Sequence, residues 1–123
     1  MRRAPKGSMT PKELKDRTKR FAVDIIQLCR ELPVTLDGRT VGQQLIRCGT
    51  SVAANYGASC RARSRAEFIA KMGTVEEEAD ESLFWLELVV DSRLATATRV
   101  EKLLKEADEL TAIFVASIKT AKR

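Results

Sequence analysis

One stretch, residues 47 to 88, constrains the fold more than any other part of this 123-residue chain. It holds the end of a segment rich in small residues, a short arginine-rich junction and a long amphipathic segment. Apolar side chains in the long segment recur every three or four residues, which is the period of a helix in a bundle. The pattern therefore predicts a helix that supplies one side of a helical core, through Phe68, Met72, Val75, Ala79, Leu83, Leu86 and Val90.

Local signals predict three further helices. A capping box begins at Thr10, with Pro11 at the first helical position, and Pro33 follows the end of that helix. Two more capping boxes begin at Ser64 and Thr98. Short connections between four helices favour an all-α, antiparallel up-down-up-down four-helix bundle. Residues 1–9 are expected to form a flexible basic N-terminal tail, and the helices to span about residues 10–32, 40–59, 65–93 and 98–121.

The predicted second helix is unusually rich in small residues. It follows a connection, residues 33–40, that is centred on Asp37-Gly38 and predicts a turn. Each glycine destabilises a helix by about 1 kcal/mol relative to alanine, so Gly42, Gly49 and Gly57 need a structural reason. Close approach of a neighbouring helix is the simplest reason, and we favour it over a ligand cleft.

Composition argues against several classes of protein. The chain has no histidine and its three cysteines are widely spaced, so we expect neither a zinc site nor a disulfide framework. No apolar run is long enough to cross a bilayer, and no hydrophobic segment of a secretory signal follows the basic first residues. We therefore expect a cytoplasmic protein without cofactor, metal or membrane partner.

Three apolar side chains of the third predicted helix lie off its core stripe. Phe84, Trp85 and Leu88 share a face with Glu77 and Glu81, and large apolar groups on an outward face are expected to be covered. We interpret this face as a subunit interface. The third predicted helix is acidic, whereas the outer face of the first is rich in lysine. Opposite charges on two faces of one protomer suit head-to-tail association into a homo-oligomeric ring. Pairing of these charges within one protomer is an equally open alternative.

Basic side chains provide candidate contacts to nucleic acid. Residues 1–20 carry a net charge of +6 and the remainder −1, so the overall +5 is an N-terminal feature. Clustered cations bind phosphates through counterion release, and a ring would multiply each cluster. From the residues alone, nucleic-acid binding and mere solubility are evenly matched. The candidates are Lys12, Lys15 and Lys19 on the first helix, and Arg61, Arg63 and Arg65 at the junction before the third.

Acidic pairs offer one catalytic interpretation. Glu78-x-x-Glu81 and Glu106-x-x-Glu109 have the spacing of the Mg²⁺ ligands in helical nucleotide pyrophosphatases. The same spacing arises by chance in glutamate-rich helices, where a run of charge is usually a solvated face. No nucleophile–base pair or phosphate-binding loop accompanies the glutamates, so we do not expect an enzyme.

Several motifs form a combined pattern that is more specific than any one of them. They are TSVAANY at 50–56, CRARS at 60–64, EFIAK at 67–71, VEEEADE at 75–81 and FWLEL at 84–88. With these motifs the chain resembles the four-helix-bundle proteins of the 23S ribosomal RNA intervening-sequence family. It departs from the family at Ala58-Ser59, where relatives often have a glutamate-glycine pair, so that acid is assigned no role here.

The resemblance implies a homopentamer of four-helix bundles and no catalytic residues. Some members are encoded inside insertions of bacterial large-subunit ribosomal RNA genes. Related accessory variability proteins of retroelements are basic pentamers that bind nucleic acid and a reverse transcriptase. Our leading hypothesis is a non-catalytic bacterial homo-oligomer that binds nucleic acid, RNA above all. The alternatives are, in order, an oligomeric protein scaffold or adaptor and a magnesium-dependent pyrophosphatase.

Overall fold

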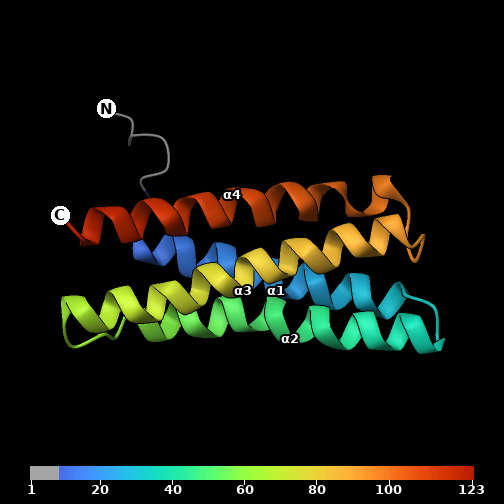
Figure 1. Cartoon of the computed structure of the whole chain (residues 1–123), viewed down its shortest axis with the longest axis horizontal. Coiled ribbons are helices and arrows are strands. Elements are labelled where there is room, and N and C mark those ends of the chain that lie inside the picture. Colours follow the sequence, from blue (N-terminus) through green and yellow to red (C-terminus); the bar gives the residue numbers. More distant parts are fainter. Residues whose placement is uncertain (1–8) are drawn as a thin grey trace.

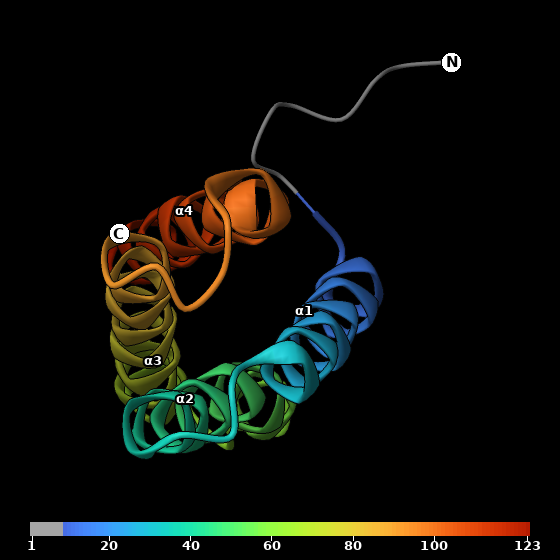
Figure 2. The same ribbon diagram turned by 90° about the vertical axis from the view of Figure 1, so that its right-hand side faces the viewer.

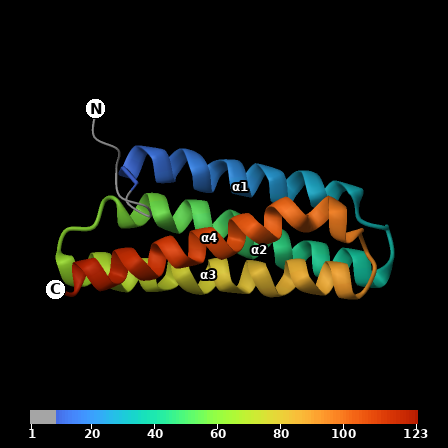
Figure 3. The same ribbon diagram turned by 90° about the horizontal axis from the view of Figure 1, so that it is seen from above.

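The computed structural model describes residues 9–123, which form four helices joined by short connections (Figure 1). Successive helices run antiparallel, and they lie side by side along most of their length (Figures 1 and 3). The described residues contain no strand, so the all-α class is confirmed. Apart from Met9, the predicted tail lies outside the described residues. The helices are α1 (Pro11–Glu31), α2 (Leu36–Ser59), α3 (Arg65–Asp91) and α4 (Ala97–Ala121).

Side chains cap the helices at their first turns. At α1 the predicted capping box forms: Thr10 Oγ1 accepts from the Glu13 amide at 3.1 Å, and the Glu13 carboxylate accepts from the Thr10 amide at 3.3 Å. At α3, Ser64 Oγ accepts from the Glu67 amide at 3.0 Å. The Glu67 carboxylate, however, accepts from the amide of Arg63 at 2.9 Å. These bonds satisfy amides that have no partner within the helix.

Helix α2 begins at Leu36, earlier than the start predicted near Thr40. Thr35 is the N-cap, and its Oγ1 accepts a hydrogen bond from the Gly38 amide at 3.2 Å. Asp37 lies in the first turn, where a carboxylate complements the helix dipole. The Asp37-Gly38 pair therefore belongs to the helix, and the prediction of a turn centred there is wrong.

Gly38 allows α2 to begin immediately after the end of α1. A Cβ atom at this position would collide with the backbone carbonyl oxygen of Pro33. Only glycine leaves room for so close an approach of the two backbone segments. A single residue type thus serves both a turn and a tight helix start, which explains why the sequence pattern misplaces the boundary.

Helix α4 begins at Ala97, with Thr96 as its N-cap. The sequence predicts a capping box from Thr98 to Glu101, but Thr96 Oγ1 accepts from the Arg99 amide at 3.2 Å instead. Two threonines in the same short segment fit two registers of the same motif, and the register that the structure adopts has no capping box.

Helix α3 ends at Asp91, before the predicted end at Arg93. Arg93 has a φ of 62°, a left-handed conformation that stops the helix. The Arg93 amide donates to the Val90 carbonyl at 3.0 Å, and the Leu94 amide donates to the Val89 carbonyl at 2.9 Å. This pair of bonds is the Schellman motif, formed here without the glycine that usually signals it.

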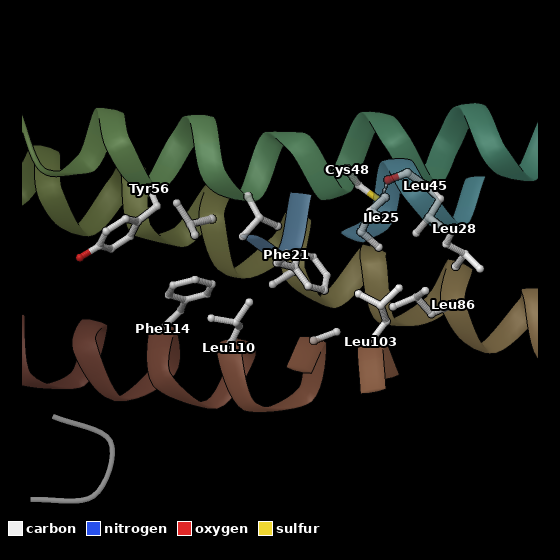
Figure 4. Packing of buried hydrophobic residues seen from close by; sticks show 14 of the residues in the cluster. Phe21, Ile25, Leu28, Leu45, Cys48, Tyr56, Leu86, Leu103, Leu110 and Phe114 are labelled. Atoms are coloured by element: carbon white, nitrogen blue, oxygen red, sulfur yellow. Dashed lines mark hydrogen bonds between the residues drawn. The ribbon is translucent and has the colours of Figure 1, made fainter. Parts of the chain in front are cut away.

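The core runs through the length of the bundle (Figure 4). At one point along it, the rings of Tyr56 and Phe114 stack with their centroids 6.0 Å apart. Most other members are aliphatic, as the low aromatic content of 5% requires. None of the helices in residues 9–123 is long and apolar enough to span a membrane.

The core stripe of α3 follows a strict alternation of three and four residues. Its buried members are Met72, Val75, Ala79, Ser82, Leu86 and Val89. The predicted stripe replaces Ser82 and Val89 by Leu83 and Val90, which are half-buried, and so it shifts by one residue in its second half. Ser82 is polar, but its hydroxyl donates to the Glu78 carbonyl at 2.8 Å, which permits its burial.

Of the three glycines that the sequence pattern singles out in this helix, two lie against α1. A Cβ atom at Gly49 would stand 3.0 Å from two carbon atoms of Ile25, and Gly42 lies beside Leu32. Close helix approach is therefore confirmed at Gly49, whereas a Cβ atom at Gly42 would meet Leu32, the C-cap residue of α1, at an ordinary contact distance of 3.6 Å. Gly57 differs, because the nearest atom to a Cβ there is the end of a flexible arginine side chain at 4.0 Å.

Candidate nucleic-acid interface

The antiparallel topology brings four chain segments to one end of the bundle. These are the start of α1, the end of α2, the start of α3 and the end of α4, and the C-terminus marks this end in Figures 1 and 3. Arg65 Nη2 donates to the backbone carbonyl of Arg123 at 2.8 Å, which ties the start of α3 to the end of the chain. We call this region the basic end, and it consists of residues 9–19, 51–75 and 113–123.

Charge is divided along the bundle axis. The basic end contains eleven basic and three acidic side chains, a net charge of +8. The rest of the described chain, residues 20–50 and 76–112, contains eight basic and fourteen acidic side chains, a net charge of −6. Because like charges in one region reinforce each other's potential, the potential is positive around the basic end and negative around the remainder.

All the predicted phosphate-contacting side chains are exposed and lie in the basic end. Lys12 forms an ion pair with Asp16 at 3.1 Å, but both side chains are so exposed that the pair is weak. Arg61 lies in the turn after α2 and donates to the Gly57 carbonyl of that helix at 3.1 Å. Arg65 is bound to the Arg123 carbonyl, as described above. The side chains of the remaining three candidates form no hydrogen bond or ion pair within residues 9–123; these are Lys15, Lys19 and Arg63.

The structure adds Lys119, Lys122 and Arg123 to this region, because the end of α4 lies beside the start of α3. They are not among the site residues predicted from the sequence. Their proximity to Arg65 is a consequence of topology: an even number of antiparallel helices returns the chain to the end where it began. Predicted helix count would have been enough to find them.

One of the two glutamate pairs considered as metal ligands binds Arg47 of α2. The Arg47 guanidinium pairs with Glu78 at 3.5 Å and also contacts Glu81. Trp85 Nε1 donates to the same Glu81 carboxylate at 3.0 Å. Burial raises the pKa of the Glu78 carboxyl, against the opposing effect of the Arg47 charge. These contacts join α2 to α3.

The other glutamate pair binds Arg17 of α1. Arg17 makes two hydrogen bonds to Glu106, at 2.7 and 2.6 Å, and one to Glu109 at 2.8 Å. The α3 pair therefore faces α2 and the α4 pair faces α1, so the two pairs do not converge. No group of three or more potential metal ligands occurs among residues 9–123. The geometry that a shared magnesium site requires is not formed.

The predicted subunit interface on α3 is only partly outward. Phe84 is 54% exposed, whereas Trp85 and Leu88 are half-buried and pack against the core. The rings of Phe84 and Trp85 meet edge to face, with centroids 5.1 Å apart. Of the two acids, Glu77 is exposed and Glu81 is engaged by α2. Phe84 is thus the main apolar group that the isolated bundle leaves uncovered on this face.

The fold and its charge distribution define a four-helix bundle with one strongly basic end. Over residues 12–116 the chain matches the family described as 23S rRNA-intervening sequence protein, and it belongs to that family. It is also similar to the crystal structure of a protein of unknown function from the S23 ribosomal protein family of Bacteroides thetaiotaomicron. That similarity has 32% sequence identity and a TM-score of 0.80 over 85% of this chain and 97% of the other. No curated protein matches the chain.

Proposed function

We propose that this protein is a non-catalytic, homo-oligomeric bundle of the bacterial cytoplasm that binds nucleic acid at its basic end. The observation that carries the proposal is the net charge of +8 in that end against −6 elsewhere. Phosphate binding through counterion release needs cations gathered in one place, which this arrangement supplies. The family's association with intervening sequences of 23S rRNA favours RNA as the polyanion. The proposed contacts are Lys12, Lys15, Lys19, Arg61, Arg63, Arg65, Lys119, Lys122 and Arg123.

Self-association is the second part of the proposal. Phe84, with Trp85 and Leu88 beneath it and Glu77 and Glu81 nearby, supports a subunit interface on the outer side of α3. The family resemblance implies five copies. If the bundle axes are parallel, every basic end lies on the same face of the ring, and a single nucleic acid meets several clusters of cations at once.

A salt series with matched variants tests the nucleic-acid part. We expect the affinity for a fluorescent RNA hairpin to fall linearly with salt concentration on logarithmic axes. Arg61→Ala/Arg63→Ala should weaken binding and reduce the slope by about 1–2 per protomer, since each phosphate contact contributes about 0.7–0.9. The control, Arg30→Ala/Arg39→Ala, removes the same charge from exposed sites at the opposite end. Equal affinities and slopes for the two variants would contradict the assignment.

A protein scaffold without nucleic-acid binding is the alternative function. The exposed Phe84 ring favours this alternative, because a different protein could cover the ring as well as a second copy of this chain could. This alternative predicts no measurable RNA affinity at moderate salt, even for the assembled protein. The same salt series therefore separates the two functions.

A further inference from the structure

Helices α1 and α4 stand apart along one side of the bundle, as the view in Figure 2 shows. The groove between them has a volume of about 640 Å³. Phe21 and Leu103 line it and are almost fully buried, so they form an apolar bottom. Arg20, Lys102 and Lys105 line its exposed sides.

Apart from Asp24, the charged side chains of this groove that are not engaged in ion pairs are positive. Arg99, also in the lining, is already bound to Glu31 through two hydrogen bonds of 2.7 Å. Glu31 and, more weakly, Asp24 raise the pKa of the Arg99 guanidinium, so the Asp24 charge is also partly compensated. The two glutamates of the lining are held by an arginine of α1. In contrast, Arg20, Lys102 and Lys105 form no ion pair among residues 9–123.

The outer side of α3 has the complementary character. Phe84 exposes 54% of its surface there. Glu77, Asp80 and Glu87 are exposed on the same helix and form no ion pair among the described residues. An apolar ring surrounded by free acids thus faces solvent, while the groove presents an apolar bottom surrounded by free cations.

Both surfaces lie at the same level along the bundle axis. Gly49 of α2 lies against Ile25, which belongs to the stretch of α1 that lines the groove. The residue before Gly49, Cys48, has its Sγ 3.3 Å from Ser82 Oγ of α3. Phe84 is two residues beyond Ser82, a distance of about 3 Å along the helix axis. Two copies with parallel axes can therefore bring Phe84 to the groove without sliding past each other.

The lysine face of α1, formed by Lys12, Lys15 and Lys19, does not lie at the same level along the axis as Phe84. Lys19 is six residues from Ile25 toward the basic end, about 9 Å along the axis, and Lys12 and Lys15 are farther still. The expected pairing of this face with the acids of α3 would need the copies to be displaced along their axes. The lysines are better placed to contact phosphates with the rest of the basic end.

We propose that the outer side of α3 in one copy docks into the α1–α4 groove of a second copy. Phe84 enters above the apolar bottom, and the free acids of α3 lie beside Arg20, Lys102 and Lys105. The two surfaces are different and lie on different sides of the bundle (Figure 2), so the contact is heterologous and repeats until a ring closes. This inference rests on the proposed self-association and specifies which surfaces produce it.

A charge-swap experiment tests the contact by light scattering. Lys102→Glu/Lys105→Glu in the groove and Glu77→Lys/Glu87→Lys on α3 should each reduce the assembled mass to the 13.7 kDa of one chain. The four substitutions together restore opposite charges across the contact and should restore the assembled mass. The control Arg30→Glu/Arg39→Glu, which reverses two charges elsewhere, should leave the wild-type mass unchanged. Circular dichroism verifies that each variant is folded.

The outcomes separate this inference from the function on which it rests. A wild-type protein that assembles, with swaps that leave its mass unchanged, overturns the docking surfaces but not self-association. Loss of assembly in both reversals without recovery in the combined variant also overturns the pairing. A wild-type protein that stays monomeric at all concentrations overturns both. Phe84→Ala, which removes only an exposed ring, should weaken assembly at least tenfold in dissociation constant, and unchanged assembly would contradict the proposal.

Discussion

Arg17 on α1 and Glu106 on α4 form a bidentate ion pair, with hydrogen bonds of 2.7 and 2.6 Å. Both side chains are only 26% exposed. The pair lies where the bundle has least contact between neighbouring helices, so it holds α1 and α4 together along a groove that hydrophobic packing leaves open.

Replacing Arg17 should therefore loosen this side of the bundle. Arg17→Ala is expected to lower the free energy of unfolding by about 1–2 kcal/mol, because three charge-assisted hydrogen bonds, two to Glu106 and one to Glu109, are lost and Glu106 is left half-buried without its partner. Lys12→Ala is the matched control, since the Lys12–Asp16 pair has exposures of 85% and 67%. Its removal should change stability by less than about 0.5 kcal/mol. Urea denaturation measures both, and equal effects would contradict the structural role of Arg17.

Two α2 glycines should respond in opposite ways to alanine. Gly57→Ala is expected to raise the free energy of unfolding by about 0.5–1 kcal/mol, because helix propensity improves and no neighbour is displaced. At Gly49 the added methyl would meet Ile25 at 3.0 Å. Overpacking of about 1–3 kcal/mol then offsets the gain. Thermal unfolding should separate the two variants by at least about 1 kcal/mol, and equal stabilisation would show that α1 and α2 do not approach so closely.

The start of α4 can be tested at its two threonines. Thr96 accepts the capping hydrogen bond from the Arg99 amide, whereas Thr98 lies inside the first turn. Thr96→Ala should lower the free energy of unfolding by about 1 kcal/mol, and Thr98→Ala should be nearly neutral. Hydrogen exchange of the Arg99 amide gives a local measurement of the same cap. The reverse order of effects would restore the start that the sequence predicts.

Magnesium should bind neither glutamate pair. Each pair is bound by an arginine from a neighbouring helix. An incoming cation would therefore have to displace a guanidinium at each pair. We expect millimolar Mg²⁺ to shift Tm by less than about 1 °C, since a ligand stabilises only what it binds. Mg²⁺-dependent hydrolysis of a nucleoside triphosphate, abolished by Glu78→Gln, would revive the pyrophosphatase hypothesis.

The fold was predictable wherever the signal is local. The cap at Thr10 and the small residues of α2 that face α1 act over a few residues or through one facing helix, so pattern and propensity reveal them. Ser82 in the core was not predictable in this way, because its burial depends on a hydrogen bond that hides its polarity. The end of α3 was missed for a related reason: Arg93 takes a backbone conformation normally marked by glycine.

The candidate site was harder to predict than the fold. Clusters close in sequence, such as Arg61 and Arg63, were found because their proximity needs no tertiary structure. The addition of Lys122 and the engagement of acids by Arg17 and Arg47 depend on which helix faces which, at separations of 31 to 92 residues for the arginine pairs. Charge alone does not encode such pairings. It is the division of charge along the axis, visible only after folding, that defines the basic end.

The thiol of Cys29 offers a pH-dependent test of the packing between α1 and α2. Burial, with a smaller contribution from Cys48, raises the pKa of Cys29 from 9.0 to about 11. The protonated thiol is favoured in the folded state, so its stabilisation is complete below pH 9 and is lost as the pH rises from 9 toward 11. Cys29→Ala should lack this alkaline loss of stability.

Alkylation provides the direct measurement. In the folded protein the rate at which iodoacetamide modifies Cys29 should rise about tenfold per pH unit and continue to rise beyond pH 9, because the thiolate is the reacting form. Below pH 9 the thiolate fraction should be about a hundredfold lower than in the unfolded chain. Peptide mass spectrometry follows the modification, and the same reaction in guanidinium chloride is the control. A native-state rate that levels off near pH 9 would mean that Cys29 is not desolvated against α2.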